Sequence, residues 1–196
     1  APDFTLGEIA QLWKGRYAIV QPHAIASLQQ LRDRVGPISV NSGYRSPKYN
    51  RGVDGATFSR HMYGDGFDFS PTEAGLSAGE SACNDLGGKL VEYNSHVHCD
   101  FRFDAVDTSF FGPATSAATY AGPRFQASLS LSAGEWEAPA EGFEEGEPRR
   151  RWTALDAEGF VIARHTGNRF APPPGTARVR VVVGGVVEVE RSFEGN

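Results

Sequence analysis

The hydrophobic pattern of the first half of the chain predicts alternating helices and strands. Apolar side chains recur at helical spacing over residues 22–35, and Gly36-Pro37 would end that helix. Residues 38–41 alternate as a short strand does, and residues 66–70 resume an extended pattern. Residues 45–58 between these strands are polar and contain glycine, so we expect a loop there.

A second helix and a hairpin are predicted further along the chain. Ser77 and Glu80 form a capping-box pattern, and the helix that follows would stop at Gly87-Gly88. Residues 89–102 then have the pattern of two strands joined by a tight turn around Asn94-Ser95. These elements predict an α+β domain in which helices flank a small antiparallel sheet.

The pattern changes near residue 120. Residues 112–122 are rich in Ala, Thr, Ser, Gly and Pro, which favours a linker. Short β-rich runs follow it, at residues 125–131, 152–155, 160–164, 177–183 and 186–193. Strands at this spacing are typical of a small β-sandwich, Ig-like or similar. We therefore expect a first domain at residues 1–111, a linker at 112–124 and an all-β accessory domain at 125–196.

Composition and charge narrow the classes of function. The chain has 196 residues, 40% of them hydrophobic and 22% charged, which is ordinary for a globular protein. Its net charge of −5 gives no electrostatic reason to bind nucleic acid or an anionic membrane surface. The longest apolar run, residues 179–189, is too short and too interrupted by charges to span a bilayer. No pattern defines the oligomeric state, and we expect a monomer.

Two histidine-bearing segments supply the side chains of a metal site. His61 is followed seven residues later by Asp68, and His96 and His98 are alternate residues of a predicted strand and so share a face. Glu92 would share that face too if the intervening turn keeps the register. Two or three imidazoles and one carboxylate are the ligand set of a catalytic zinc site with one position open for water. We therefore predict one bound zinc ion.

Each of these residues has an ordinary alternative on its own. A single surface histidine is seldom a ligand, and Asp68 would also suit a turn. Their order along the chain favours the metal site, because Gly64 and Gly66 allow the backbone to bend tightly between His61 and Asp68.

Two features bear on the compartment in which the protein works. The cysteines, Cys83 and Cys99, are either buried free thiols or one disulfide that ties a helix to the metal-bearing strand. The disulfide would require an oxidising compartment. The chain begins Ala1-Pro2-Asp3-Phe4 without a visible signal peptide, which is typical of a processed mature end or of a chosen boundary.

Four ordered motifs over about residues 3–105 carry a family resemblance. They are Phe4-Thr5-Leu6-Gly7-Glu8 with Leu28-x-x-Leu31-Arg32, Ser42-Gly43-Tyr44-Arg45-Ser46-Pro47-Lys48-Tyr49-Asn50, Ser59-x-His61-x-x-Gly64-x-Gly66-x-Asp68 and His96-x-His98-x-Asp100. They resemble the signature of the M15 zinc peptidases, the carboxypeptidases, dipeptidases and endopeptidases that cut bacterial peptidoglycan stem peptides. The segment from Glu92 to Cys99 looks closer to the signalling domain of hedgehog proteins, which shares this fold and zinc site.

The resemblance implies a role for each matched residue. His61, Asp68 and His98 would bind the zinc ion. His96 would lie near the bound water or the developing oxyanion, and Arg45 would hold a substrate carboxylate or the scissile carbonyl. The ordinary alternative for the arginine is a surface salt bridge. Three further side chains would line the pocket: Ser42, Tyr44 and Ser59, the last of which also suits a turn or cap.

One departure from the family pattern concerns the general base. Several of these peptidases carry an acidic residue three positions before the last zinc ligand, where this chain has Ser95. The nearest carboxylate is that of Glu92, six positions before His98, as in the hedgehog pattern. Glu92 is therefore the expected base, and His96 is the alternative.

The sequence therefore supports two functions. The first is a zinc metallopeptidase that hydrolyses peptidoglycan stem-peptide bonds with zinc-activated water, as a D,D-carboxypeptidase or a murein endopeptidase. The second is a catalytically silent, zinc-stabilised module of hedgehog type that binds or signals. The peptidase interpretation implies a secreted or periplasmic protein of the bacterial cell envelope, and with it a Cys83–Cys99 disulfide.

The C-terminal region carries no chemistry that its pattern identifies. Trp136 and Trp152 would stack on sugars if exposed, but tryptophans of this kind more commonly lie in a core.

Overall fold

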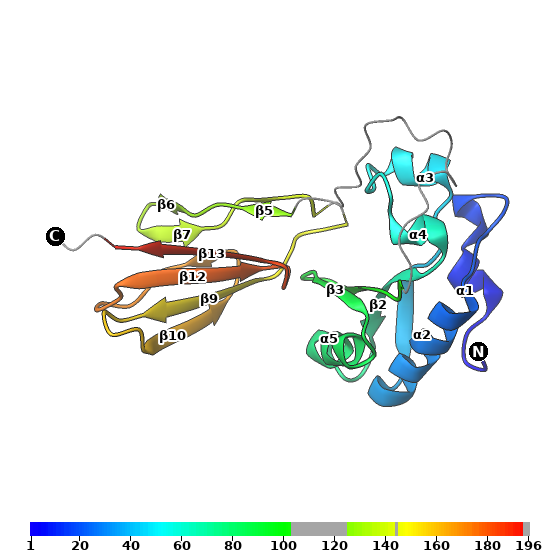
Figure 1. The fold of residues 1–196 in the computed structure, drawn as a ribbon, viewed down its shortest axis with the longest axis horizontal. Coiled ribbons are helices and arrows are strands. Elements are labelled where there is room, and N and C mark those ends of the chain that lie inside the picture. Colours follow the sequence, from blue (N-terminus) through cyan, green and yellow to red (C-terminus); the bar gives the residue numbers. More distant parts are fainter. Residues whose placement is uncertain (103–124, 144, 194–196) are drawn as a thin grey trace. The chain divides into compact units, whose positions relative to one another are not determined.

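The computed structural model (Figure 1) describes residues 1–102, 125–143 and 145–193. Its contacts divide the chain into two compact units, the first formed by Ala1–Val91 with Ser95–Pro123 and the second by Glu92–Asn94 with Arg124–Asn196. The predicted linker at residues 112–124 lies outside the described residues. Among the helices of the described stretches, none is both long and apolar enough to cross a membrane.

A four-stranded sheet in the order β1-β2-β4-β3 organises the first unit. Its strands are β1 (Ile38–Ser42), β2 (Gly66–Pro71), β3 (Lys89–Glu92) and β4 (Val97–Asp100). Strand β2 pairs antiparallel with β1 on one side and with β4 on the other. The strands predicted in this part of the chain are confirmed.

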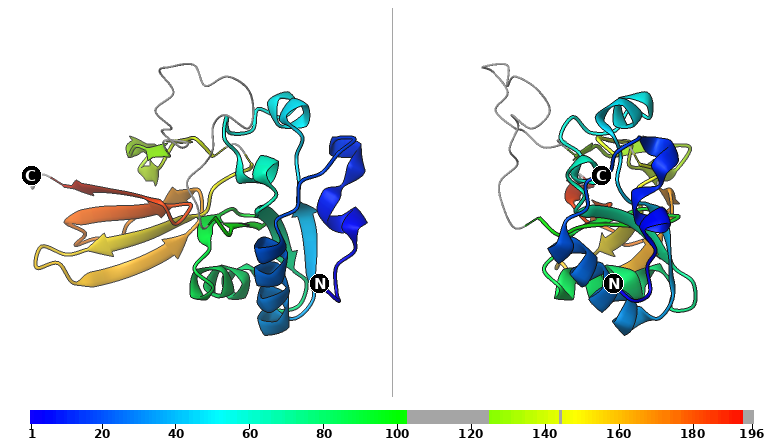
Figure 2. Two further views of the ribbon diagram at one scale, coloured as in Figure 1. Left: turned by 45° about the vertical axis from the view of Figure 1, so that its right-hand side comes forward. Right: turned by 90° about the vertical axis from the view of Figure 1, so that its right-hand side faces the viewer.

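Two helices cover one face of this sheet, as Figures 1 and 2 show. They are α2 (Pro22–Val35) and α5 (Leu76–Asp85), which contact each other. Their apolar side chains and those of β2 and β4 form one core, whose members include Leu28, Leu31, Phe67, Phe69 and Val97. Because side chains alternate along a strand, the residues between these strand positions face away from the core.

The helix predicted at residues 22–35 is confirmed, but the N-terminus predicted for the second helix is wrong. Helix α5 begins at Leu76, and its N-cap residue is Gly75 with a φ of 77° that glycine adopts readily. Ser77 therefore lies inside the first turn rather than at the N-cap, and Glu80 is a buried helical residue.

Short helices occupy segments in which the pattern predicts none. They are α1 (Leu6–Ala10), the 3-10 helix η1 (Leu12–Lys14), α3 (Pro47–Gly52) and α4 (Arg60–Tyr63). The expectation of a loop throughout residues 45–58 is therefore wrong. Helix α3 forms because Ser46 accepts a hydrogen bond from the Tyr49 N–H and Pro47 fills the first helical position.

A disulfide joins Cys83 of α5 to Cys99 of β4. Both cysteines are fully buried in the core of the first unit. Gly88 packs against this bond, since a Cβ at that position would lie 2.5 Å from the Cys99 Sγ atom. The disulfide thus ties a core helix to the strand that carries His98.

The regular elements described at residues 125–143 and 145–193 are strands, and the pairings described for them are antiparallel. The largest sheet has the order β10-β9-β12-β13, with β9 (Arg150–Leu155), β10 (Val161–Thr166), β12 (Arg178–Val183) and β13 (Val187–Ser192). A second sheet has the order β11-β7-β6, with β6 (Ser130–Ser132), β7 (Glu135–Glu137) and β11 (Arg169–Phe170). A third, two-stranded sheet pairs β5 (Gln126–Ala127) with β8 (Ala140–Glu141). The single strand predicted at residues 125–131 is thus broken into β5 and β6.

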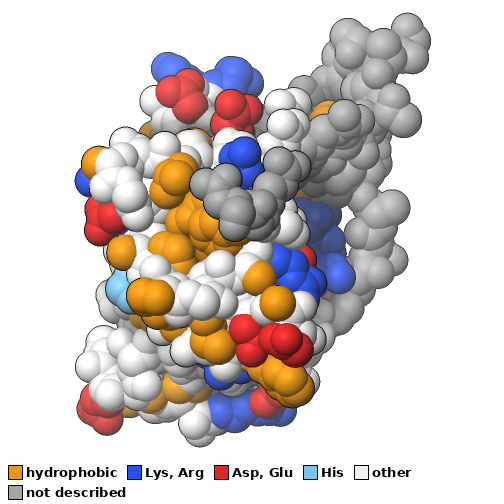
Figure 3. Space-filling model, turned by 90° about the vertical axis from the view of Figure 1, so that its left-hand side faces the viewer, with side chains coloured by type: hydrophobic (Ala, Val, Ile, Leu, Met, Phe, Trp, Pro, Cys, Tyr) orange, Lys and Arg blue, Asp and Glu red, His pale blue; other side chains and the backbone are white. Residues whose placement is uncertain are grey.

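One apolar core joins the strands of the second unit. Trp136 of β7 and Trp152 of β9 lie in it with Val179 and Val181 of β12. Both tryptophans are buried, which confirms the commoner of the two alternatives and excludes their stacking on sugars. Hydrophobic side chains also reach the surface on the face of this unit that Figure 3 presents.

Candidate active site

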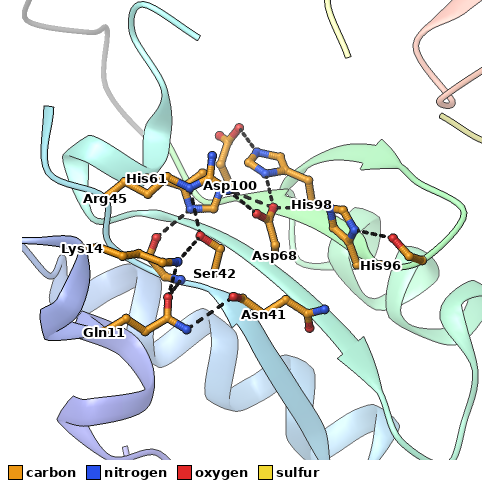
Figure 4. Close-up of polar contacts among 12 residues, drawn as sticks. Gln11, Lys14, Asn41, Ser42, Arg45, His61, Asp68, His96, His98 and Asp100 are labelled. Atoms are coloured by element: carbon orange, nitrogen blue, oxygen red, sulfur yellow. Dashed lines mark hydrogen bonds and ion pairs between the residues drawn. The ribbon is translucent and has the colours of Figure 1, made fainter. Parts of the chain in front are cut away.

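The register of the first sheet brings two predicted zinc ligands together. Asp68, in the middle of β2, pairs with Ser42 of β1 on one side and with His98 of β4 on the other. The His98 Nδ1 atom lies 2.8 Å from the Asp68 Oδ1 atom (Figure 4). Sheet pairing therefore positions residues that are thirty apart in the sequence.

The third predicted ligand, His61, comes from the short helix α4. Gly64 ends this helix with a φ of 75°, and a Cβ there would lie 2.1 Å from the Ile19 carbonyl oxygen. Glycine is required for both reasons, because other residues rarely adopt this backbone conformation and would clash. The turn directs His61 toward β2, where its Nε2 atom lies 3.3 Å from the Asp68 Oδ1 atom.

The three side chains offer a compact set of donor atoms for a metal ion. One donor atom from each of His61, Asp68 and His98 lies within 4.8 Å of the others. All three residues are at least nine-tenths buried. Two imidazole nitrogens and one carboxylate oxygen are typical of catalytic zinc sites, which keep a further position for water or substrate. The residues present therefore fit a zinc ion.

A hydrogen bond fixes the orientation of the His61 ring. Its Nδ1 atom lies 2.7 Å from the Gly43 carbonyl oxygen, which can only accept, so Nδ1 carries the proton. In the neutral ring, the Nε2 atom then presents its lone pair toward the Asp68 Oδ1 atom. Two electron-rich atoms this close are stabilised by a cation between them, and such a carbonyl contact is common behind metal-binding histidines.

Asp100 contacts the other side of the His98 ring. Its Oδ2 atom lies 3.6 Å from the His98 Nε2 atom, and both carboxylate oxygens accept hydrogen bonds from Arg102. Burial raises the pKa of Asp100, but the hydrogen bonds from Arg102 and His98 outweigh it and lower that pKa to about 2. Asp100 is therefore an ionised partner that orients the ligand histidine.

His96 also faces this site. Its Nε2 atom lies 3.9 Å from the Asp68 Oδ1 atom, and its Nδ1 atom lies 3.0 Å from the Ser95 hydroxyl oxygen. The ring is buried beside the ligands. This placement suits a group that acts on a substrate atom next to the metal.

Arg45 lies in the site rather than at the surface. Its Nη2 atom donates to the Asp68 Oδ2 atom at 2.7 Å, and its Nε atom donates to the Ser42 Oγ atom at 2.9 Å. Both charged side chains of the ion pair are more than nine-tenths buried, so the alternative of a surface salt bridge is wrong. The arginine thus orients a predicted zinc ligand directly.

Two other predicted pocket residues are buried close to these elements. Tyr44 follows Gly43, donates its backbone N–H to the Ile9 carbonyl oxygen at 2.9 Å, and has a pKa that burial raises. Ser59 is the N-cap residue of α4, although its side chain makes no capping hydrogen bond. Their part in substrate binding stays a prediction.

Glu92, the expected general base, belongs to the second unit. Its backbone N–H donates to the Gly184 carbonyl oxygen, and its Oε1 atom lies 3.0 Å from the Arg151 Nη2 atom. The carboxylate is buried in this pair. The identity of the general base stays a prediction, with Glu92 and His96 both open.

The structure adds two polar residues that the sequence pattern does not single out. Lys14 and Gln11 lie next to Ser42, and both are buried. Their spacing of three residues is the only signal in the sequence, and it is common to most helical turns.

Comparison with known proteins agrees with this geometry. Aligned over 79 positions, the chain is 38% identical to the zinc D-Ala-D-Ala carboxypeptidase of Streptomyces albus G, and the matched part is 36% of this chain and 31% of that protein. The chain thus spans about a third of the length of this relative. The likeness of residues 92–99 to hedgehog proteins stays a prediction. The sequence model described as Peptidase M15 matches residues 2–100, just over half of the chain, and the predicted resemblance is thereby confirmed: the chain belongs to the Peptidase M15 family.

Proposed function

We propose that this protein is a zinc-dependent peptidase that hydrolyses a bond to a D-amino acid in peptidoglycan stem peptides. The observation that carries the proposal is the cluster of His61, Asp68 and His98 within the part of the chain that matches the Peptidase M15 family. The similarity to a zinc D-Ala-D-Ala carboxypeptidase supports both the metal and the class of substrate.

His61, Asp68 and His98 are the residues that would hold one zinc ion; the His61 Nε2 and His98 Nδ1 atoms lie 3.3 Å and 2.8 Å from the Asp68 Oδ1 atom. A zinc ion bound there would lower the pKa of a water ligand to about 7 and would act as a Lewis acid toward the scissile carbonyl group. The surrounding contacts hold these ligands in place. Gly43 fixes the His61 ring, and Asp100 fixes the His98 ring.

Other polar side chains of the chain would orient the ligands, stabilise the negative charge of the transition state and transfer protons. Arg45 donates to the Asp68 Oδ2 atom, which leaves the Oδ1 atom directed at the histidines. The His96 Nε2 atom lies 3.9 Å from the Asp68 Oδ1 atom, and from there it would donate to the oxygen that becomes negative in the transition state. Glu92 or His96 would take the proton of the attacking water and pass it to the leaving amine.

The same site suits a carboxypeptidase or an endopeptidase. A guanidinium binds a terminal carboxylate as readily as it polarises an internal carbonyl group, so Arg45 does not separate the two. Because peptidoglycan lies outside the cytoplasm, we propose that the protein is secreted or periplasmic and acts as a monomer. The Cys83–Cys99 disulfide supports an oxidising location.

One observation favours a second candidate, a zinc-stabilised binding module of hedgehog type without catalysis. The Glu92 carboxylate is buried and pairs with Arg151, a contact that suits a structural role for this residue. The substitution Glu92→Gln separates the two functions. A peptidase that uses Glu92 loses turnover and keeps its zinc, whereas a binding module shows no turnover before or after the substitution and keeps its zinc.

The direct test is incubation of the zinc-loaded protein with peptidoglycan fragments that carry intact pentapeptide stems and cross-links, with products identified by mass. Loss of one terminal alanine would establish a carboxypeptidase, and separation of cross-linked dimers would establish an endopeptidase. The variant Asp68→Asn serves as the inactive control. No product from a protein shown to hold zinc would refute the peptidase and favour the binding module.

A further inference from the structure

Lys14 is a buried lysine that the proposed mechanism leaves without a role. It ends the 3-10 helix η1 and is only 6% exposed. Its Nζ atom donates to the Ser42 Oγ atom at 2.8 Å and to the side-chain oxygen of Gln11. Burying an ammonium group costs free energy unless hydrogen bonds compensate, so its placement beside Ser42 is informative.

Ser42 stands between two cations. Its Oγ atom accepts one hydrogen bond from Lys14 and another from the Arg45 Nε atom at 2.9 Å. A hydroxyl oxygen has two lone pairs, so these donors use both. Arg45 then donates to Asp68. A continuous chain of contacts therefore runs from Lys14 through Ser42 and Arg45 to a predicted zinc ligand (Figure 4).

The backbone around Gln11 holds Lys14 in this position. Gln11 has a φ of 46°, which places its side chain back toward β1. Its Oε1 atom accepts from the Gly43 N–H at 3.1 Å, and its Nε2 atom donates to the Val40 and Asn41 carbonyl oxygens. The anchor of Lys14 is thus fixed to the strand that carries Ser42.

We propose that Lys14 is a positioning residue of the active site. By donating to Ser42, its ammonium group turns the hydroxyl hydrogen away and presents a lone pair to Arg45. The guanidinium group is then held in the position from which it donates to Asp68 and binds the substrate. The effect on substrate rests on the proposed peptidase function, whereas the coupling between Lys14 and Arg45 does not.

The coupling is tested by NMR on the zinc-loaded protein without substrate. The Arg45 Nε–H resonance, identified by its loss in Arg45→Lys, should shift and its exchange with water should speed up at least about tenfold in Lys14→Met. Ser42→Ala should give the same change, and the exposed control Lys89→Met should give none. A dispersed spectrum shows that each variant is folded. An unchanged Arg45 resonance in folded Lys14→Met would overturn the proposal.

The effect on substrate is tested by kinetics in a double-mutant cycle. Lys14→Met should lower kcat/KM about ten- to a hundredfold, the range for partners that orient metal ligands, while zinc content stays at the wild-type value. In the Ser42→Ala background the same substitution should change kcat/KM less than about twofold, because Lys14 acts through Ser42. If Lys14→Met lowers kcat/KM by the same factor in the Ser42→Ala background as in the wild type, Lys14 acts independently of Ser42 and the proposal is refuted.

The two measurements separate the two hypotheses. If the wild-type protein cleaves no peptidoglycan fragment, the proposed function fails and the kinetic cycle with it. The NMR comparison still decides whether Lys14 positions Arg45. If cleavage occurs and the resonance does not move, the function stands and the role of Lys14 is refuted.

Discussion

The Nη2 atom of Arg45 lies 2.7 Å from the Oδ2 atom of Asp68, so the arginine expected to meet substrate also holds a predicted zinc ligand. Both side chains are more than nine-tenths buried. Removing one partner of a buried ion pair leaves the other charge uncompensated, which costs more than the pair itself contributes. Substitutions at Arg45 should therefore affect metal binding as well as the substrate.

Arg45→Met is expected to weaken zinc binding and lower kcat/KM, each about ten- to a hundredfold, because Asp68 loses the group that orients it. It should also destabilise the fold by about 3 kcal/mol. Competition with a chromogenic chelator measures the zinc affinity, and urea unfolding measures the stability. Arg45→Lys keeps the positive charge but lacks the planar guanidinium group. Its zinc affinity, kcat/KM and stability should therefore lie between those of the wild type and of Arg45→Met. Wild-type zinc affinity in Arg45→Met would contradict the role assigned to this contact.

Removal of a predicted ligand should abolish metal retention. After dialysis, the wild-type protein is expected to keep about one zinc ion per chain, and His61→Ala or Asp68→Asn should keep almost none. Atomic emission spectroscopy gives the metal content. The control is His165→Ala, because this exposed histidine lies in the second unit. Retention of zinc by both ligand variants would rule the site out.

Chelation should lower the thermal stability reversibly. A ligand that binds only the folded state adds about 2.7 kcal/mol when its concentration is a hundred times its Kd. Differential scanning calorimetry should therefore show a lower Tm after chelator treatment and recovery on addition of zinc. Magnesium should not restore it, because this ion prefers oxygen ligands. A Tm that is the same with zinc and after chelator treatment would argue against a bound ion in the folded protein.

The Cys83–Cys99 disulfide should contribute about 3 kcal/mol to the free energy of unfolding, the magnitude for a loop of this length. Urea unfolding of the double variant Cys83→Ala/Cys99→Ala measures this loss. Zinc content should be retained, because His98 projects from the opposite face of β4. A variant as stable as the wild type would show that the core alone holds α5 against β4.

The start of α1 should make stability depend on pH. Thr5 and Glu8 form a capping box there, and the hydrogen bonds from the Thr5 backbone and side chain lower the pKa of Glu8. A lowered pKa in the folded state stabilises the protein above the ordinary value near 4.5, and this stabilisation is lost as the pH falls through the folded value. Urea midpoints of the wild type and Glu8→Gln should differ at pH 6 and converge in acid. A constant difference would contradict this assignment.

Local patterns are sufficient to predict the central elements of the first unit. Helix α2 has an unbroken apolar stripe, and in β2 the phenylalanines alternate with Asp68, so each residue's face follows from its position. The starts of α5 and α3 depend on single residues instead. Gly75 and Ser46 decide these boundaries through backbone conformation and capping, which a pattern of apolar positions does not contain.

The candidate site is only partly predictable for a similar reason. The spacing of His61, Asp68 and His98 can be recognised in the sequence, but the contact of Asp68 with Arg45 depends on how distant strands pair. Lysine side chains are usually exposed and tryptophans usually buried, but Lys14 and its neighbour Trp13 show the opposite. Trp13 beside it is 72% exposed, whereas the lysine is buried because Ser42 and Gln11 bond its ammonium group.

All four residues of strand β4 are buried, so neither face of the strand is free to contact solvent. Val97 and Cys99 face the core and the disulfide, while His98 and Asp100 face the metal site. A slip of β4 by one residue against β2 would exchange these faces, which would press His98 against α5 and turn Cys99 toward the zinc ligands. The register of this strand pair is thus as strictly constrained as the ligands themselves, and a change in the length of the preceding turn should be tolerated only where β4 keeps that register.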